Sequence, residues 1–226
     1  MNEIPNESAL AATARIASLT AASIIPIAGG PLGVFIAEAY ARHKDRKLEA
    51  FFQEILQRIA GLEKIQSEEG VQALLSDQNF KSLLYEAAII SEKTLQDKKI
   101  ALLQNAVVNS RSGNQSLDKR SMFLRYIDEL TESHLQLMAL LHNPRGFYES
   151  NNLEWSDWTI GGKTVLIQSV FPDWDMGFID QLVKDLNARG LVSLSTIHGI
   201  SSPHSMADSS STGLGIEFSR FVERPE

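Results

Sequence analysis

The chain has 226 residues, of which 43% are hydrophobic and 22% charged, an ordinary globular composition that suffices for one large domain or two small ones. A net charge of −7 argues against a general nucleic-acid binder, which carries a basic face. The chain has no cysteine, which excludes disulfides, zinc–thiolate sites and thiol catalysis. A cytoplasmic location is therefore the default expectation, and the acidic start of the chain, with Glu3 and Glu7, predicts no secretory signal.

The least polar stretch comes first. Between Ile16 and Ala37 lie 22 residues without a formal charge, interrupted by Pro26 and by the turn signal Gly29-Gly30-Pro31. Its strongly apolar residues sum to roughly −3 to −5 kcal/mol for insertion, and the polar, proline and glycine residues bring the balance near zero. We expect a helical hairpin that contacts a membrane through Ile16, Leu19, Ile24, Ile25, Ile27, Leu32, Val34, Phe35 and Ile36.

A basic cluster follows this hairpin. Basic flanks attract anionic lipid headgroups and stay cytoplasmic, so we expect the rest of the chain on the cytoplasmic side, peripheral to or inserted at the inner membrane. The equal alternative is a hairpin buried in a soluble core, with the basic cluster merely solvated. The candidate headgroup contacts are Arg42, Lys44, Arg46 and Lys47.

A heptad seam comes next, because apolar residues step by four and three along the chain. It covers only about two and a half heptads, fewer than a free coiled coil needs. One amphipathic helix packing on its neighbours is the main interpretation, and a self-associating helix is the other. The seam residues are Leu48, Phe52, Ile55, Ile59 and Leu62.

The region 71–110 has helical periodicity, without proline or glycine, and predicts two helices with a bend near Ser76 to Asn79. A loop follows at Ser110 to Ser116. We expect a buried stripe made of Leu95, Ile100, Leu102, Leu103, Ala106 and Val107. The expected domains are therefore an apolar hairpin with a long amphipathic helix (1–66), a helical body (67–116) and a C-terminal module (117–226).

The C-terminal module is expected to be a winged-helix-like α+β module on a mainly α chain. Thr131 restarts a helix that Pro144 ends, and a loop with aromatic anchors follows. Another helix ends at Gly190, and 191–197 is expected to form a short strand. A polar loop then leads to a last helix capped by Thr212.

No catalytic motif emerges. Gly161 to Thr164 resembles the end of a phosphate loop, but Asp157 stands where that motif needs glycine, so a tight turn is expected there. The five histidines form no metal-binding pattern, and His134 and His142 are expected at the surface and at a helix end. We therefore expect a protein that is not an enzyme, without metal or cofactor. The segment 151–226 has ten acidic and five basic residues, and a surface of this sign repels the DNA backbone, which argues against DNA binding.

Four stretches together resemble bacterial Abi-alpha-type proteins, which are linked to abortive infection. They are "ISEKTLQDKKIALLQNAVVNS", "FLRYIDELTESHLQLMALLHNP", "LVKDLNARGLVSLS" and "TGLGIEFSRFV". The resemblance covers roughly residues 85 to 226 and consists of helix-packing patterns. It implies a helical body, a C-terminal winged-helix-like module and a role in antiphage defence, and it supplies no catalytic residues.

The leading hypothesis is a non-enzymatic antiphage-defence protein that associates with or permeabilises the membrane through residues 16–37 and self-associates as a homo-oligomer. The second is a soluble adaptor whose acidic C-terminal module binds a partner protein, such as a product of the same operon. A DNA-binding regulator is the third.

Overall fold

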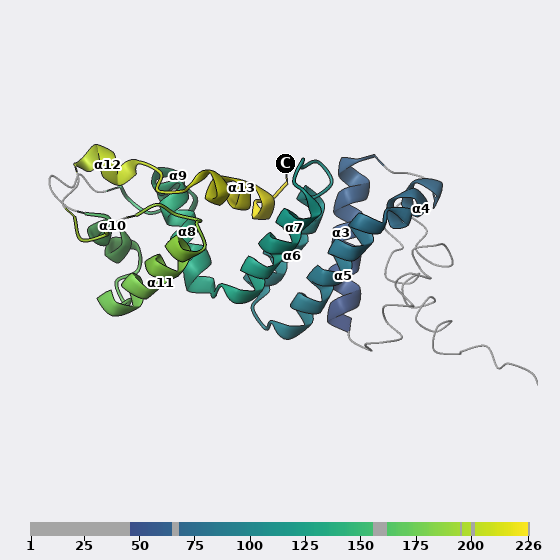
Figure 1. Cartoon of the computed structure of the whole chain (residues 1–226), viewed down its shortest axis with the longest axis horizontal. Coiled ribbons are helices and arrows are strands. Elements are labelled where there is room, and N and C mark those ends of the chain that lie inside the picture. Colours follow the sequence, from purple (N-terminus) through teal and green to yellow (C-terminus); the bar gives the residue numbers. More distant parts are fainter. Residues whose placement is uncertain (1–45, 65–67, 156–161, 195, 200–201, 226) are drawn as a thin grey trace, which may run out of the picture. The chain divides into compact units, whose positions relative to one another are not determined.

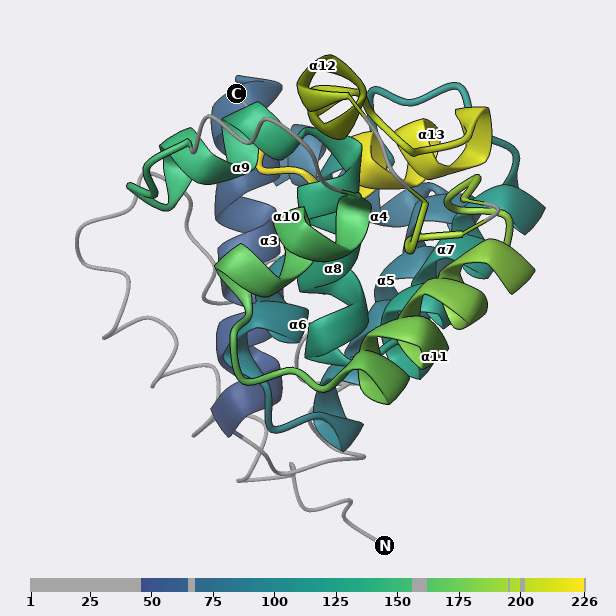
Figure 2. The ribbon, with the colours of Figure 1, turned by 90° about the vertical axis from the view of Figure 1, so that its left-hand side faces the viewer.

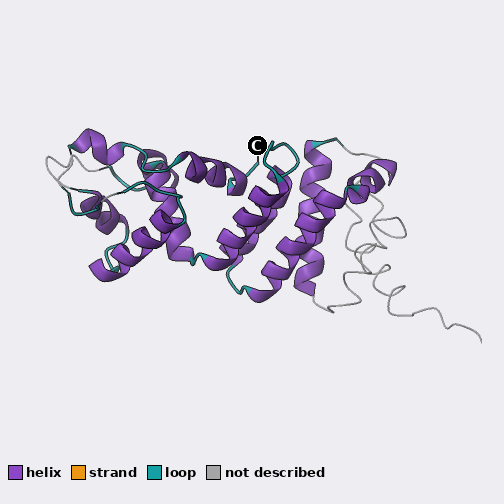
Figure 3. Cartoon of the chain, in the orientation of Figure 1, coloured by secondary structure: helices purple, strands orange, loops and turns teal. Residues whose placement is uncertain are grey.

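A computed structural model describes residues 46–64, 68–155, 162–194, 196–199 and 202–225. Within these ranges the regular elements are helices, and β structure is limited to one isolated bridge between Val192 and Ser211 (Figure 3). The expectation of a mainly α chain is confirmed. The chain divides into two compact units: unit 1 comprises Met1–Arg125 with Arg224–Glu226, and unit 2 comprises Tyr126–Glu223.

Unit 1 is built on α3 (Arg46–Leu62), which packs against α5 (Gln78–Lys93) and α6 (Asp97–Asn109) (Figure 1). The short α4 (Glu68–Ser76) lies against α5. The side chains that fill this core are almost fully buried: Phe52, Ile55, Ile59, Leu84, Leu103, Ala106 and Val107. At about 25 cal/mol per Å² of apolar surface, such burial is the main stabilising contribution in the unit.

The helical stretch of unit 1 divides differently from the sequence expectation. The bend near Ser76 to Asn79 is confirmed, because Asp77 caps α5 by accepting the N–H groups of Asn79 and Phe80. A second break occurs at Thr94, whose hydroxyl accepts the Gln96 N–H, so three helices stand where two were expected. This break turns Leu95 outward, and its 86% exposure makes its place in the buried stripe wrong.

Unit 2 is centred on α8 (Glu132–His142), which packs against α9 (Pro144–Ser150), α11 (Met176–Ala188) and α13 (Gly213–Val222) (Figure 2). It also contains α10 (Lys163–Val170) and α12 (Pro203–Ala207), and α12 contacts α9. Helix α7 (Leu117–Glu129) supplies its last residues to unit 2 and its earlier ones to unit 1.

Several local signals of unit 2 are confirmed. Thr131 and Thr212 cap α8 and α13 by accepting the N–H groups of His134 and Gly215. Gly190 follows α11 with a φ of +69°, a left-handed conformation that glycine adopts without steric cost.

The winged-helix α+β module is not supported. The segment expected as a strand forms only the Val192 bridge, because the side chain of Asn187 takes both backbone groups of Leu194. Its amide donates to the Leu194 carbonyl at 3.0 Å and its oxygen accepts the Leu194 N–H at 3.0 Å. The backbone N–H and carbonyl of Leu194 are therefore not available for pairing with a neighbouring strand.

Three segments expected as loops or turns contain helices instead. Pro144 ends α8 but also occupies the first turn of α9, where its missing N–H is tolerated. Gly162 is the N-cap of α10, so Lys163 and Thr164 begin a helix and do not form the tight turn that was expected there. Ser202 caps α12 within the expected polar loop by accepting the Ser205 N–H.

Candidate functional site

The expected membrane-contact residues, from Ile16 to Ile36, lie outside the described residues, as do Arg42 and Lys44. Arg46 and Lys47 begin α3, but their side chains also fall outside the description. Among the helices that the structure describes, none combines the length and the apolar character that a bilayer crossing requires.

The heptad seam serves the chain's own core. Leu48, Phe52, Ile55 and Ile59 are buried, on a helix that packs against α5 and α6, whereas Leu62 is 47% exposed. The expectation of one amphipathic helix packing on its neighbours is confirmed. Self-association through this seam stays a prediction, and Leu62 is its one member with an exposed side chain, because the other four are covered within unit 1.

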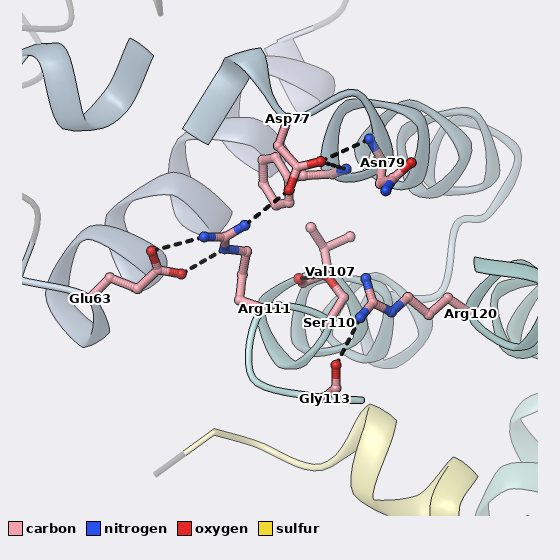
Figure 4. Close-up of polar contacts among 9 residues, drawn as sticks. Glu63, Asp77, Asn79, Val107, Ser110, Arg111, Gly113 and Arg120 are labelled. Atoms are coloured by element: carbon pink, nitrogen blue, oxygen red, sulfur yellow. Dashed lines mark hydrogen bonds and ion pairs between the residues drawn. The ribbon is translucent and has the colours of Figure 1, made fainter. Parts of the chain in front are cut away.

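A polar cluster in the described part of unit 1 is centred on Arg111 (Figure 4). Its Nε and Nη2 donate to the two carboxylate oxygens of Glu63 at 2.7 and 3.2 Å, and Nη1 reaches Asp77 at 3.4 Å. Its guanidinium carbon lies 5.6 Å from the centre of the Phe80 ring. The hydrogen bond to Glu63 raises the pKa of Arg111. With two carboxylates around one guanidinium, the cluster joins three segments and is not an anion site.

A cavity of about 530 Å³ opens beside this cluster. Polar groups line one part of it, and aliphatic side chains line another. The lining residues are Ile59, Leu62, Glu63, Val108, Asn109, Arg111, Ser112 and Pro225. Because its charged groups already neutralise each other, the cavity presents no unpaired cation for a phosphate or carboxylate ligand.

Lys163 is a buried charged residue of unit 2. Only 7% exposed, it donates from Nζ to the carbonyl of Met206 at 3.0 Å and to that of Asp208 at 2.6 Å. Burial lowers its pKa, and the charge of Asp208 opposes that shift. Its neighbour Thr164 donates to the carbonyl of Ile197. These bonds fasten the start of α10 to the segment 197–208, which is a structural role.

His134 is buried rather than at the surface, which corrects the expectation. Its Nδ1 accepts the Thr131 N–H at 3.2 Å, so in the neutral ring Nε2 carries the proton toward Asp185, 3.3 Å away. Burial lowers the pKa of His134, and Asp185 opposes that shift. The Thr131 hydroxyl lies 2.7 Å from His134 Nδ1, so hydroxyl, imidazole and the Asp185 carboxylate stand in the order of a catalytic triad. The Thr131 hydroxyl, however, accepts the His134 N–H and completes a capping box, so we assign this network to helix capping.

An aromatic surface lies on unit 2, and we use this name for Phe147, Phe171, Trp174 and Phe178. The rings of Phe171 and Trp174 are stacked, with centres 3.9 Å apart and planes 7° apart. Phe178 meets Trp174 edge-on at 5.5 Å, and Phe147 meets Phe171 at 6.2 Å. Phe178 is 38% exposed and the other three are partly exposed. Grouped, partly exposed rings of this kind are typical of binding surfaces.

Charge is distributed unequally between the units. Unit 2 has thirteen acidic and five basic residues, a net charge of −8, whereas unit 1 has fifteen acidic and sixteen basic residues, a net charge of +1. Around the aromatic surface, the segment from Phe171 to Gln181 contains three aspartates and no basic residue.

No group of histidine, aspartate and glutamate side chains suited to a metal ion is found in the described ranges. The sequence analysis missed the Arg111 cluster, whose partners are 34 and 48 positions away, and no local signal could have shown it. It also missed the aromatic surface, although the spacing of Phe171, Trp174 and Phe178 at three and four positions was a usable signal.

No protein-family model, no curated protein and no solved structure matches the chain significantly.

Proposed function

We propose that the chain is a non-enzymatic antiphage-defence protein of the abortive-infection kind, which acts at the inner membrane through residues 16–37. The observation that supports this proposal is one of sequence: 22 successive uncharged residues with two prolines and a glycine turn, followed by a basic cluster. Insertion free energy near zero suits a segment that passes between a protected state and the bilayer. The basic cluster adds attraction to anionic headgroups of about 1 kcal/mol per residue near the surface.

Within this proposal, the helical part of the chain that follows residue 45 controls the segment. A homo-oligomer or a partner protein holds residues 16–37 away from lipid until infection releases them. The self-association that we propose uses surfaces other than the buried residues of α3, since these stabilise unit 1.

The test is dye leakage from vesicles of phosphatidylglycerol and phosphatidylethanolamine, together with growth arrest on overexpression. We expect leakage and arrest with the natural chain and loss of both in Ile25→Glu and Phe35→Glu, because a carboxylate near the bilayer centre costs about 3 kcal/mol. The matched control is Ile89→Glu on α5, which places the same charge at a side chain already 52% exposed. Undiminished leakage in both hairpin variants contradicts the proposal.

A second candidate function is that of an adaptor, in which unit 2 binds a partner protein. The observation that favours it is the net charge of −8 on this unit, next to grouped aromatic side chains. A stable complex with the product of a neighbouring gene, dissociated by salt, is the expected result. If the chain forms no complex with any neighbouring gene product at low salt, the adaptor function is ruled out.

A further inference from the structure

We infer that the aromatic surface of unit 2 binds a basic segment of a partner protein, through arginine or lysine side chains that lie on the rings. This inference deepens the adaptor proposal and rests on it. It assigns the binding surface and the chemistry of the partner.

The geometry of the rings provides the apolar half of the site. Phe171 and Trp174 form one stacked pair, and Phe147 and Phe178 meet it edge-on from α9 and α11. Each ring restrains its neighbour, so the surface is organised before a partner arrives and little side-chain entropy is lost on binding. Tryptophan and phenylalanine are the residues that interface cores favour.

The charges around the rings select the partner. Asp173 and Asp175 flank Trp174 in the chain, and Asp180 lies two positions after Phe178; all three are exposed. Two of these carboxylates already have roles: Asp175 caps α11 and Asp180 contacts His198 at 2.9 Å. Because three exposed carboxylates lie near the rings, a negatively charged ligand would be repelled. A basic side chain, in contrast, can place its aliphatic stem on the rings and its charged head near the carboxylates.

The chain already shows this kind of contact close by in the sequence. The guanidinium of Arg145, in α9, lies 4.7 Å from the centre of the Trp155 ring. Tryptophan is the best ring for a cation–π contact, and arginine is found in such contacts more often than lysine. The partner segment that we propose repeats this contact on Trp174.

The experiment uses the full chain and a fluorescent peptide of alternating arginine and alanine, with a glutamate–alanine peptide as the charge control. Fluorescence anisotropy measures the dissociation constant. We expect the basic peptide to bind and the acidic one not to bind. Trp174→Ala should weaken binding about tenfold, as for a central aromatic anchor, and Trp174→Phe should retain most of it because it keeps a ring.

Asp173→Asn should weaken binding about threefold at low salt and have no effect at high salt, where the charge is screened. The matched control is Asp97→Asn on α6, which removes the same exposed charge from unit 1 and should leave binding unchanged. A thermal unfolding curve for each variant separates lost binding from lost folding.

Equal affinity of all variants, or equal binding of the acidic peptide, overturns the inference. Self-association that depends on Trp174, without peptide binding, also overturns it and assigns the surface to a second copy of the chain. If a complex with a neighbouring gene product forms and survives Trp174→Ala, the surface is wrong while the adaptor function stands. If no such complex forms, the adaptor function itself fails.

Discussion

Gly215→Ala should destabilise unit 2 more than any other single methyl group added to α13. Gly215 lies in the first turn of this helix, where a Cβ atom would stand 1.9 Å from the carbonyl oxygen of Leu191 and 2.9 Å from its carbonyl carbon. These are backbone atoms, so the contact cannot be relieved by rotating a side chain. The same carbonyl oxygen accepts the Thr212 N–H at 3.1 Å.

The magnitude follows from three contributions. Overpacking of this kind costs about 1–3 kcal/mol, and separating the two backbones loses the Thr212 hydrogen bond, worth about 1 kcal/mol. Alanine recovers up to about 1 kcal/mol relative to glycine inside a helix. With that recovery, the net expectation is a loss of about 1–3 kcal/mol in the free energy of unfolding. For a unit of roughly a hundred residues this lowers the Tm by about 5–20 °C.

The assay is urea or thermal unfolding followed by tryptophan fluorescence. All three tryptophans of the chain belong to unit 2, so the signal reports this unit alone. The control is Gly213→Ala, in the same helix, where an added Cβ meets no atom within 4 Å. This variant should be neutral or slightly stabilising. If the two variants have the same urea midpoint and the same Tm, the close approach of α13 to Leu191 is wrong.

Three further predictions concern other parts of the core. Ile55→Ala should lower the free energy of unfolding of unit 1 by about 2–5 kcal/mol, whereas Leu62→Ala should change it little; circular dichroism measures both, and equal small effects contradict the packing of α3. Because the folded pKa of His134 is lowered, the unfolded chain binds more protons, so the stability of unit 2 should fall as the pH drops below about 6.5 toward the folded pKa. His134→Gln, which keeps a capping side chain at this position, should flatten that part of the pH profile, and an unchanged profile refutes the assignment. Lys163→Met should cost unit 2 about 1–3 kcal/mol in fluorescence-monitored unfolding, because two carbonyl groups lose their donor; a stability equal to that of the natural chain contradicts this role.

Local signals in the sequence were sufficient for much of the fold. The caps made by Thr131 and Thr212 and the turn at Gly190 each act within one helical turn of their own position, so a short stretch of sequence is enough to predict them. The seam of α3 likewise predicted a buried face, because its spacing matches the helix period.

Features that depend on distant residues could not be predicted in this way. The expected strand after Gly190 fails because Asn187 satisfies the backbone groups of Leu194, a contact that sequence periodicity does not show. The Arg111 cluster joins segments separated by dozens of residues, and charge alone does not pair them. Leu95 has the right spacing for a core position, but the Thr94 break moves it out of the helix.

The central proposal is that residues 16–37 move from a protected state into the inner membrane. Membrane potential during phage challenge tests it most directly, in cells that express the chain with its genomic neighbours. The account predicts depolarisation with the natural chain and with Ile89→Glu, and a maintained potential with Ile25→Glu and Phe35→Glu combined. Protection from phage while the potential stays constant, or depolarisation that persists in the combined variant, contradicts it.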